Sequence, residues 1–127
     1  MEHRNAAQAD VYLIAVRDFV VLRDLEDTVR EFDPDAVVLT STRLEEAIAQ
    51  ITAQSRLALA FVEAGPARVA EVKLDALVRS KGGRIVLLGD DAEDEWDGER
   101  PASHRWPTLL RPFSSQTVLS MIVACRG

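Results

Sequence analysis

The stretch LLRPFSS, residues 109–115, changes character three times within a few positions. Its apolar part ends at Arg111, and Pro112 then stops further strand pairing because proline has no backbone N–H. Ser114 and Ser115 follow at once, and serine is a preferred N-cap of a helix. The stretch therefore predicts a strand end that carries a basic side chain, with a helix directly behind it. In open α/β sheets this is the edge at which ligands bind.

Size and composition limit the classes of protein that need to be considered. The chain has 127 residues, of which 47% are hydrophobic, as in an ordinary globular domain. We expect a loose leader over residues 1–10 and one domain over residues 11–127. The single cysteine, Cys125, and the lack of a signal peptide or a long apolar run favour a cytoplasmic protein without a membrane segment. The net charge of −6 argues against nucleic-acid binding, which needs a basic face.

Short apolar runs alternate with segments of helical period along the whole chain. Strands are predicted at 11–16, 36–39, 57–62, 85–88 and 108–110, and helices at 18–32, 42–55, 66–81 and 115–125. This alternation indicates a parallel sheet with right-handed crossovers. We expect a flavodoxin-like α/β fold, a three-layer sandwich of five βα units with strand order 2-1-3-4-5. The acidic, Gly- and Pro-containing stretch between residues 90 and 106 predicts a fourth helix that is short or absent.

Two of the predicted helices carry local signals at their ends. Ser41 or Thr42 can cap the second helix, and Glu45 follows Thr42 at the spacing of a capping box. The third helix is expected to continue without interruption to Lys81, where a glycine pair ends it. The sequence therefore predicts a side-chain cap for one helix and an unbroken course for the next.

The order of these segments resembles the response-regulator receiver domain. The last strand of that family ends in Lys-Pro-Phe, as this chain has RPF at residues 111–113. Residues 13–14 with 24–28 are similar to the family's first strand and first helix, and residues 56–60 to the lead-in to its phosphorylated aspartate. The resemblance covers about residues 11–123. It implies the flavodoxin-like fold and a part in two-component signal transduction, or phosphorelay signalling.

A receiver carries its chemistry on five positions around one pocket, and in this chain the resemblance assigns them to other residue types. The two Mg²⁺-binding acids become Val16 and Arg17, the phosphoacceptor aspartate becomes Phe61, the hydroxyl residue becomes Leu88 or Gly89, and the lysine becomes Arg111. Valine and arginine offer no oxygen ligand to Mg²⁺, and phenylalanine offers no nucleophile. The resemblance thus implies a pseudo-receiver, which is not an enzyme and holds no metal or other cofactor.

The register of the third strand has an alternative. A shift of two positions places Glu63 rather than Phe61 at the acceptor position, on the same face of the strand. A glutamate there can imitate a phosphorylated aspartate and hold an active-like state. The spacing to Leu88 and Arg17 favours Phe61, and the alternative stays open.

Two arginines near the predicted pocket each allow two interpretations. Arg17 is either a solvated loop residue or a built-in cation in place of Mg²⁺, paired with Asp18, Asp90 or Glu63. Arg111 either contacts a bound anion or forms an ion pair with a nearby acid. The acidic run over residues 90–99 departs from the calcium-loop pattern and fits a solvated loop.

The last predicted helix carries more apolar residues than one sheet-facing stripe needs. These residues are Val118, Leu119, Met121, Ile122 and Val123. The surplus predicts an interface. Receivers commonly dimerise through this edge, so the resemblance points to the same helix and to a homodimer.

Two functions are compatible with these residues. The first is a stand-alone pseudo-receiver that acts by phosphorylation-independent protein–protein interaction, with a histidine kinase, another regulator or a second copy of itself as the partner. The second is a small flavodoxin-like enzyme or ligand-binding domain, since a fold does not fix a function. Stabilisation by a nucleotide, flavin or metal would favour the second.

Overall fold

The computed structural model describes residues 9–90, 92–93, 106–111 and 113–126. Within these ranges four strands form one parallel sheet in the order β2-β1-β3-β4. The strands are β1 (Val11–Ala15), β2 (Val37–Ser41), β3 (Leu59–Glu63) and β4 (Arg84–Leu88). The helices are α1 (Phe19–Phe32), α2 (Leu44–Ala53), α3 (Pro66–Glu71), α4 (Leu74–Ser80) and α6 (Ser115–Arg126). The predicted alternation and the predicted flavodoxin-like strand order are confirmed.

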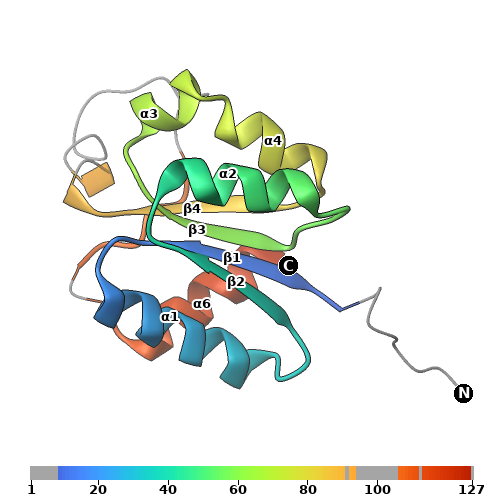
Figure 1. Ribbon diagram of the computed structural model, residues 1–127. Helices are drawn as coiled ribbons and strands as arrows, with labels where there is room; N and C mark the ends of the chain where they lie inside the picture. Colours follow the sequence, from blue (N-terminus) through green and yellow to red (C-terminus); the bar gives the residue numbers. More distant parts are fainter. Residues whose placement is uncertain (1–8, 91, 94–105, 112, 127) are drawn as a thin grey trace, which may run out of the picture.

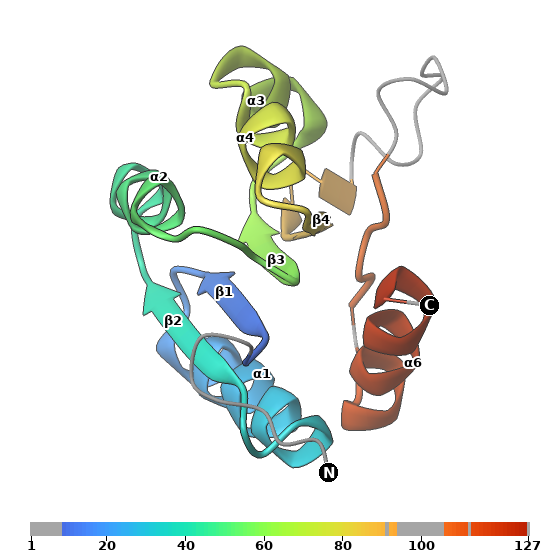
Figure 2. The ribbon, with the colours of Figure 1, turned by 90° about the vertical axis from the view of Figure 1, so that its right-hand side faces the viewer.

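Helices cover both faces of the sheet, which gives the expected three layers. Figures 1 and 2 show α2, α3 and α4 on one face and α1 and α6 on the other. Because side chains alternate along a strand, β1 supplies Tyr12 and Ile14 to the α1–α6 core and Leu13 and Ala15 to the α2–α4 core. None of the described helices is long and apolar enough to cross a membrane.

The predicted fifth strand consists, in the described residues, of one parallel bridge between Thr108 and Leu87. The Leu87 N–H donates to the Pro107 carbonyl and the Leu109 N–H to the Leu87 carbonyl, both at 2.8 Å. This segment therefore lies beside β4, where the predicted order places the fifth strand. Residues 1–8 of the expected leader lie outside the described residues, as do Pro112 and most of the expected fourth-helix region.

The prediction of one unbroken helix over residues 66–81 is wrong. The helix divides at Val72 and Lys73 into α3 and α4, and Lys73 adopts a left-handed conformation with φ of 57°. In a continuous helix, Val69 and Leu74 would lie about 140° apart around the axis, so both could not face the sheet. The break allows both side chains to be fully buried.

The side-chain cap predicted for the second helix is also wrong. Arg43 stands at the N-cap of α2 and makes no side-chain capping bond. Ser41 belongs instead to β2, because its carbonyl accepts the Val16 N–H at 3.0 Å and extends the parallel pairing. The Ser41 hydroxyl accepts the Arg43 N–H at 3.1 Å and lies 3.0 Å from the Glu46 carboxylate. The hydroxyl thus acts at the strand end rather than inside the helix.

Candidate functional site

The carboxyl ends of β1, β3 and β4 meet at one edge of the sheet. Val62 lies opposite Ala15 and Glu63 opposite Leu88 in the parallel register. The residues that follow these positions, Arg17 after β1 and Gly89 after β4, therefore come close to Glu63. This edge is the place where open α/β folds bind ligands.

Three of the receiver-site positions assigned from the sequence carry buried apolar side chains. Val16, Phe61 and Leu88 belong to the core cluster that faces α1 and α6. Phe61 is fully buried. Hydrocarbon side chains in a closed core offer neither a nucleophile nor a metal ligand.

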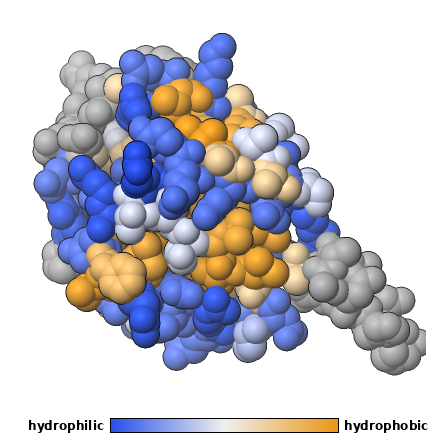
Figure 3. Space-filling model, in the orientation of Figure 1, coloured by the Kyte–Doolittle hydropathy of each residue, from blue (hydrophilic) through white to orange (hydrophobic). Residues whose placement is uncertain are grey.

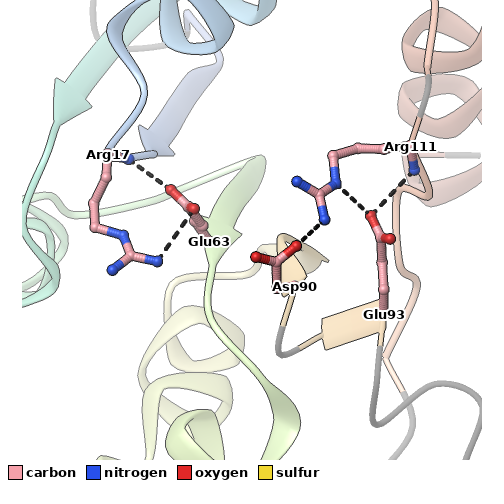
Figure 4. Close-up of polar contacts among 5 residues, drawn as sticks. All are labelled: Arg17, Glu63, Asp90, Glu93 and Arg111. Carbon is pink, nitrogen blue, oxygen red and sulfur yellow. Dashed lines mark hydrogen bonds and ion pairs between the residues drawn. The ribbon is translucent and has the colours of Figure 1, made fainter.

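Arg17 pairs with Glu63, one of the three acids that the sequence offers as partners. The Arg17 backbone N–H donates to Glu63 Oε1 at 2.7 Å, and the guanidinium Nη2 donates to Oε2 at 3.3 Å (Figure 4). Asp18 serves another purpose, since its carboxylate accepts the first free N–H groups of α1 as the N-cap. Glu63 is the last residue of β3, so the ion pair joins the ends of two neighbouring strands.

Arg111 forms the second ion-paired group of this edge, with Asp90 and Glu93 (Figure 4). Its Nε donates to Glu93 Oε2 at 2.7 Å and its backbone N–H donates to the same oxygen at 3.2 Å. The side-chain hydrogen bond from Arg111 lowers the pKa of Glu93, and the two carboxylates raise the pKa of Arg111. The interpretation of Arg111 as an ion-pair residue therefore agrees with its contacts.

Gly89 brings the backbone of β4 close to the Glu63 side chain. Its φ of +104° is unfavourable for other residues. A Cβ at this position would lie 2.8 Å from Glu63 Cγ, closer than a real contact allows. Of the two residues, Leu88 and Gly89, to which the resemblance assigns the hydroxyl position, Gly89 is thus one at which a side chain would displace Glu63.

An open pocket of about 410 Å³ adjoins the Arg17–Glu63 pair on the side of α2 and α3. Arg43 and Arg68 line it together with the pair. Neither arginine is among the candidate residues predicted from the sequence, although each follows a predicted strand by a few positions. In the described residues no group of three or more His, Cys, Asp or Glu side chains is arranged to hold a metal ion.

The structure narrows the interface predicted on the last helix. Val118 and Ile122 are buried against the sheet and α1, so they are not available to a partner. Leu119 and Met121 are half-buried, while Val123 is 57% exposed. The apolar surplus is smaller than the sequence suggests because α6 packs against α1 and against β3 of the sheet.

No protein-family model matches the chain, and no curated protein matches it. Solved structures, in contrast, do match the chain. The chemotaxis protein CheY4 of Vibrio cholerae superposes with a TM-score of 0.67 at 17% identity, covering 92% of this chain and 98% of its own. The chain has the CheY-like flavodoxin fold. A response regulator receiver protein of Sinorhizobium medicae WSM419 superposes with a TM-score of 0.62 at 20% identity, covering 94% of this chain and 98% of its own.

Proposed function

We propose that this protein is a pseudo-receiver: a module of two-component-type signalling that acts by contact with a protein partner, without accepting a phosphoryl group and without catalysing a reaction. The proposal is supported by the likeness to a chemotaxis protein and a receiver protein over more than nine-tenths of the chain. The observation that carries it is the Arg17–Glu63 ion pair at the end of β3.

The ion pair opposes the chemistry of phosphoryl transfer at this edge. Mg²⁺ needs oxygen ligands that are free to bind it, and both oxygens of the Glu63 carboxylate already accept hydrogen bonds from Arg17. A guanidinium stays charged at any physiological pH, so a fixed cation stands beside this carboxylate. The Arg17 guanidinium would repel a Mg²⁺ ion that approached this carboxylate. We infer that the permanent Arg17–Glu63 charge pair takes the place of the transient charge that a phosphoryl group adds in a phosphorylated receiver.

The second ion-paired group favours a fixed docking surface in the same way. Arg111 joins Asp90 and Glu93 to the segment that leads into α6. The Arg17–Glu63 pair joins the ends of β1 and β3, and the Arg111 contacts join the segment after β4 to the segment that leads into α6. A surface built on such contacts is available to a partner without prior modification.

The decisive experiment exposes the purified protein to acetyl phosphate and Mg²⁺ and records its intact mass over time, beside a phosphorylatable receiver as the positive control. We expect no gain of a phosphoryl group, because the acceptor position offers either the buried Phe61 or the ion-paired Glu63. Stoichiometric formation of a hydroxylamine-labile acyl phosphate would overturn the proposal.

A second measurement does not depend on covalent chemistry. Beryllofluoride with Mg²⁺ imitates a bound phosphoryl group, and amide NMR spectra report whether it binds. We expect the signals of Arg17, Glu63 and Arg111 to stay unchanged in the wild type. Saturable shifts confined to these residues would show that the edge still binds a phosphoryl group.

A further inference from the structure

The pocket beside the Arg17–Glu63 pair carries an excess of basic side chains in an acidic chain. Three arginines line it, Arg17, Arg43 and Arg68, against two glutamates, Glu45 and Glu63. The whole chain has 15 basic and 21 acidic residues, so the pocket reverses the balance of the molecule. In Figure 3 strongly hydrophilic side chains gather at the left of the view, where the strand ends lead into α2. A local excess of positive charge in a concave site attracts anions.

Arg43 is the cation of this pocket that no acid of the described residues neutralises. Its guanidinium forms neither an ion pair nor a hydrogen bond within the described ranges. Arg17 is held by Glu63, whereas Arg68 pairs at 2.9 Å with Glu71, whose side chain is 68% exposed. Exposed pairs contribute little to stability, so the Arg68 guanidinium is available to a stronger acceptor.

The backbone at the start of α2 adds donors to the same pocket. The first N–H of α2 with a backbone acceptor is that of Ala47, and the helix has no side-chain cap. The N–H groups of Leu44 and Glu45, which line the pocket, therefore have no acceptor in the described part of the chain. The start of α1 differs, since Asp18 caps it. The uncapped helix end and Arg43 together offer hydrogen-bond donors that an acceptor-rich ligand would satisfy.

Neither glutamate of the pocket cancels this donor surface. Both oxygens of the Glu63 carboxylate already accept hydrogen bonds from Arg17. Glu45 is exposed to water in the first turn of α2, and water weakens the repulsion between its carboxylate and an anion. The pocket is therefore suited to a negatively charged ligand.

The shape of the pocket selects the kind of anion. Its arginines come from three segments: after β1, before α2 and within α3. A phosphoryl group presents three oxygens in different directions, whereas a carboxylate presents two in one plane. Ala15, Leu44 and Ala64 give the pocket an apolar part, and its volume of about 410 Å³ suits a small organic molecule.

We propose that this pocket binds a small phosphate ester, with the phosphoryl group at Arg43 and the first N–H groups of α2, and the carbon skeleton against the apolar part. Arg68 exchanges Glu71 for the ligand. Binding is noncovalent and needs no Mg²⁺. Figure 4 shows that the Arg111 group lies apart from the Arg17–Glu63 pair, and Arg111 does not line this pocket. The inference goes beyond the proposed function and does not rest on it, because a protein that accepts no phosphoryl group covalently is still able to bind a phosphate ester.

Amide and arginine side-chain NMR spectra test the site, in Mg²⁺-free solution at constant ionic strength, with ribose 5-phosphate as the probe and ribose as its control. We expect saturable shifts of the Leu44 and Glu45 amide signals and of the Arg43 and Arg68 Nε–H signals, with a dissociation constant below about 1 mM. The Arg111 signals are expected to stay in place. The proposal is overturned if ribose 5-phosphate causes no saturable shift, or if ribose alone causes the same shifts.

Charge variants separate a specific site from general attraction. Arg43→Gln is expected to weaken binding of ribose 5-phosphate by about tenfold or more. Arg23→Gln is the matched control, because it removes an exposed charge of α1 outside the pocket and is expected to leave the affinity unchanged. Glu45→Gln is expected to strengthen binding severalfold, since it removes an acid that repels the anion. Equal weakening by Arg43→Gln and Arg23→Gln would exclude the site.

A backbone variant tests the donors of α2. Leu44→Pro removes one N–H, and the helix is retained because proline is favoured at the first helical position and Arg43 before it is extended. Leu44→Ala shortens the same side chain but keeps the N–H, and thermal unfolding confirms that both variants fold. Leu44→Pro is expected to bind ribose 5-phosphate severalfold more weakly than Leu44→Ala. Equal affinities would overturn the assignment of the phosphoryl group to the start of α2.

Discussion

At the scale of single residues, Gly89 decides how closely β4 approaches the Glu63 side chain. Gly89→Ala forces a side chain into a φ of +104° and places its Cβ 2.8 Å from Glu63 Cγ. We expect the variant to lower the free energy of unfolding by about 1–3 kcal/mol and to move Glu63 away from Arg17. Urea unfolding gives the first quantity, and NMR signals of the Arg17 amide and guanidinium report the second.

Gly82 provides the matched control for that substitution. Its φ is +83°, and a Cβ there would meet no atom within 4 Å, so Gly82→Ala carries backbone strain alone. Gly89→Ala should therefore cost more than Gly82→Ala, and adding Glu63→Ala should recover part of the difference. Equal losses for the two glycines, with no recovery, would show that the contact with Glu63 is unimportant.

The partner of Arg17 shows which contacts of a single residue can be predicted from the sequence and which cannot. The sequence limited the choice to Asp18, Asp90 and Glu63 but could not decide among them. The decision depends on the register between β1 and β3, which joins residues 46 positions apart. Asp18 is excluded by its local role as the N-cap of α1, a role that the sequence prediction did not assign because it took Asp18 as the first residue of the helix.

At the scale of elements, the break between α3 and α4 depends on a strained residue. Lys73 is the one described non-glycine residue with a positive φ. Lys73→Gly removes this strain, and we expect it to raise the free energy of unfolding by up to about 1 kcal/mol, since glycine adopts the left-handed conformation at no steric cost. Urea unfolding monitored by circular dichroism measures the change.

Ala76→Gly is the control within α4, where the residue is exposed and helical. There glycine is expected to lower the free energy of unfolding by about 1 kcal/mol, because it only increases the freedom of the unfolded chain. If Lys73→Gly lowers stability to the same degree, the left-handed conformation of Lys73 does not exist in solution.

Elements were predictable where they depend on local pattern and less so where they depend on packing. The strands of the sheet and α1, α2 and α6 follow from apolar periodicity and were found to within a few residues. The break at Lys73 was not, because it arises from the need to bury Val69 and Leu74 together. The exposure of α6 was misjudged for a similar reason, since the sequence does not show how deeply Val118 and Ile122 lie.

At the scale of the whole molecule, Arg111 connects the end of β4 to the segment that leads into α6. Its hydrogen bond lowers the pKa of Glu93 in the folded state. A carboxyl with a lowered folded pKa contributes stability that is present above its ordinary pKa of 4.5 and is lost as the pH falls through the folded value. The stability difference between wild type and Arg111→Gln should therefore be present at neutral pH and shrink in acid. Urea unfolding at a series of pH values between about 7 and 3 checks this.

Arg23→Gln is the control for net charge, because Arg23 is exposed on α1 and has no ion pair among the described residues. Removing this charge changes the general electrostatics of an acidic chain as Arg111→Gln does, but breaks no specific contact. The pH dependence of Arg111→Gln should exceed that of Arg23→Gln in the range where Glu93 titrates. Identical profiles would mean that Arg111 acts only through net charge. A larger loss for Arg111→Gln would show that an ion pair between distant segments helps to hold the α6 layer onto the sheet.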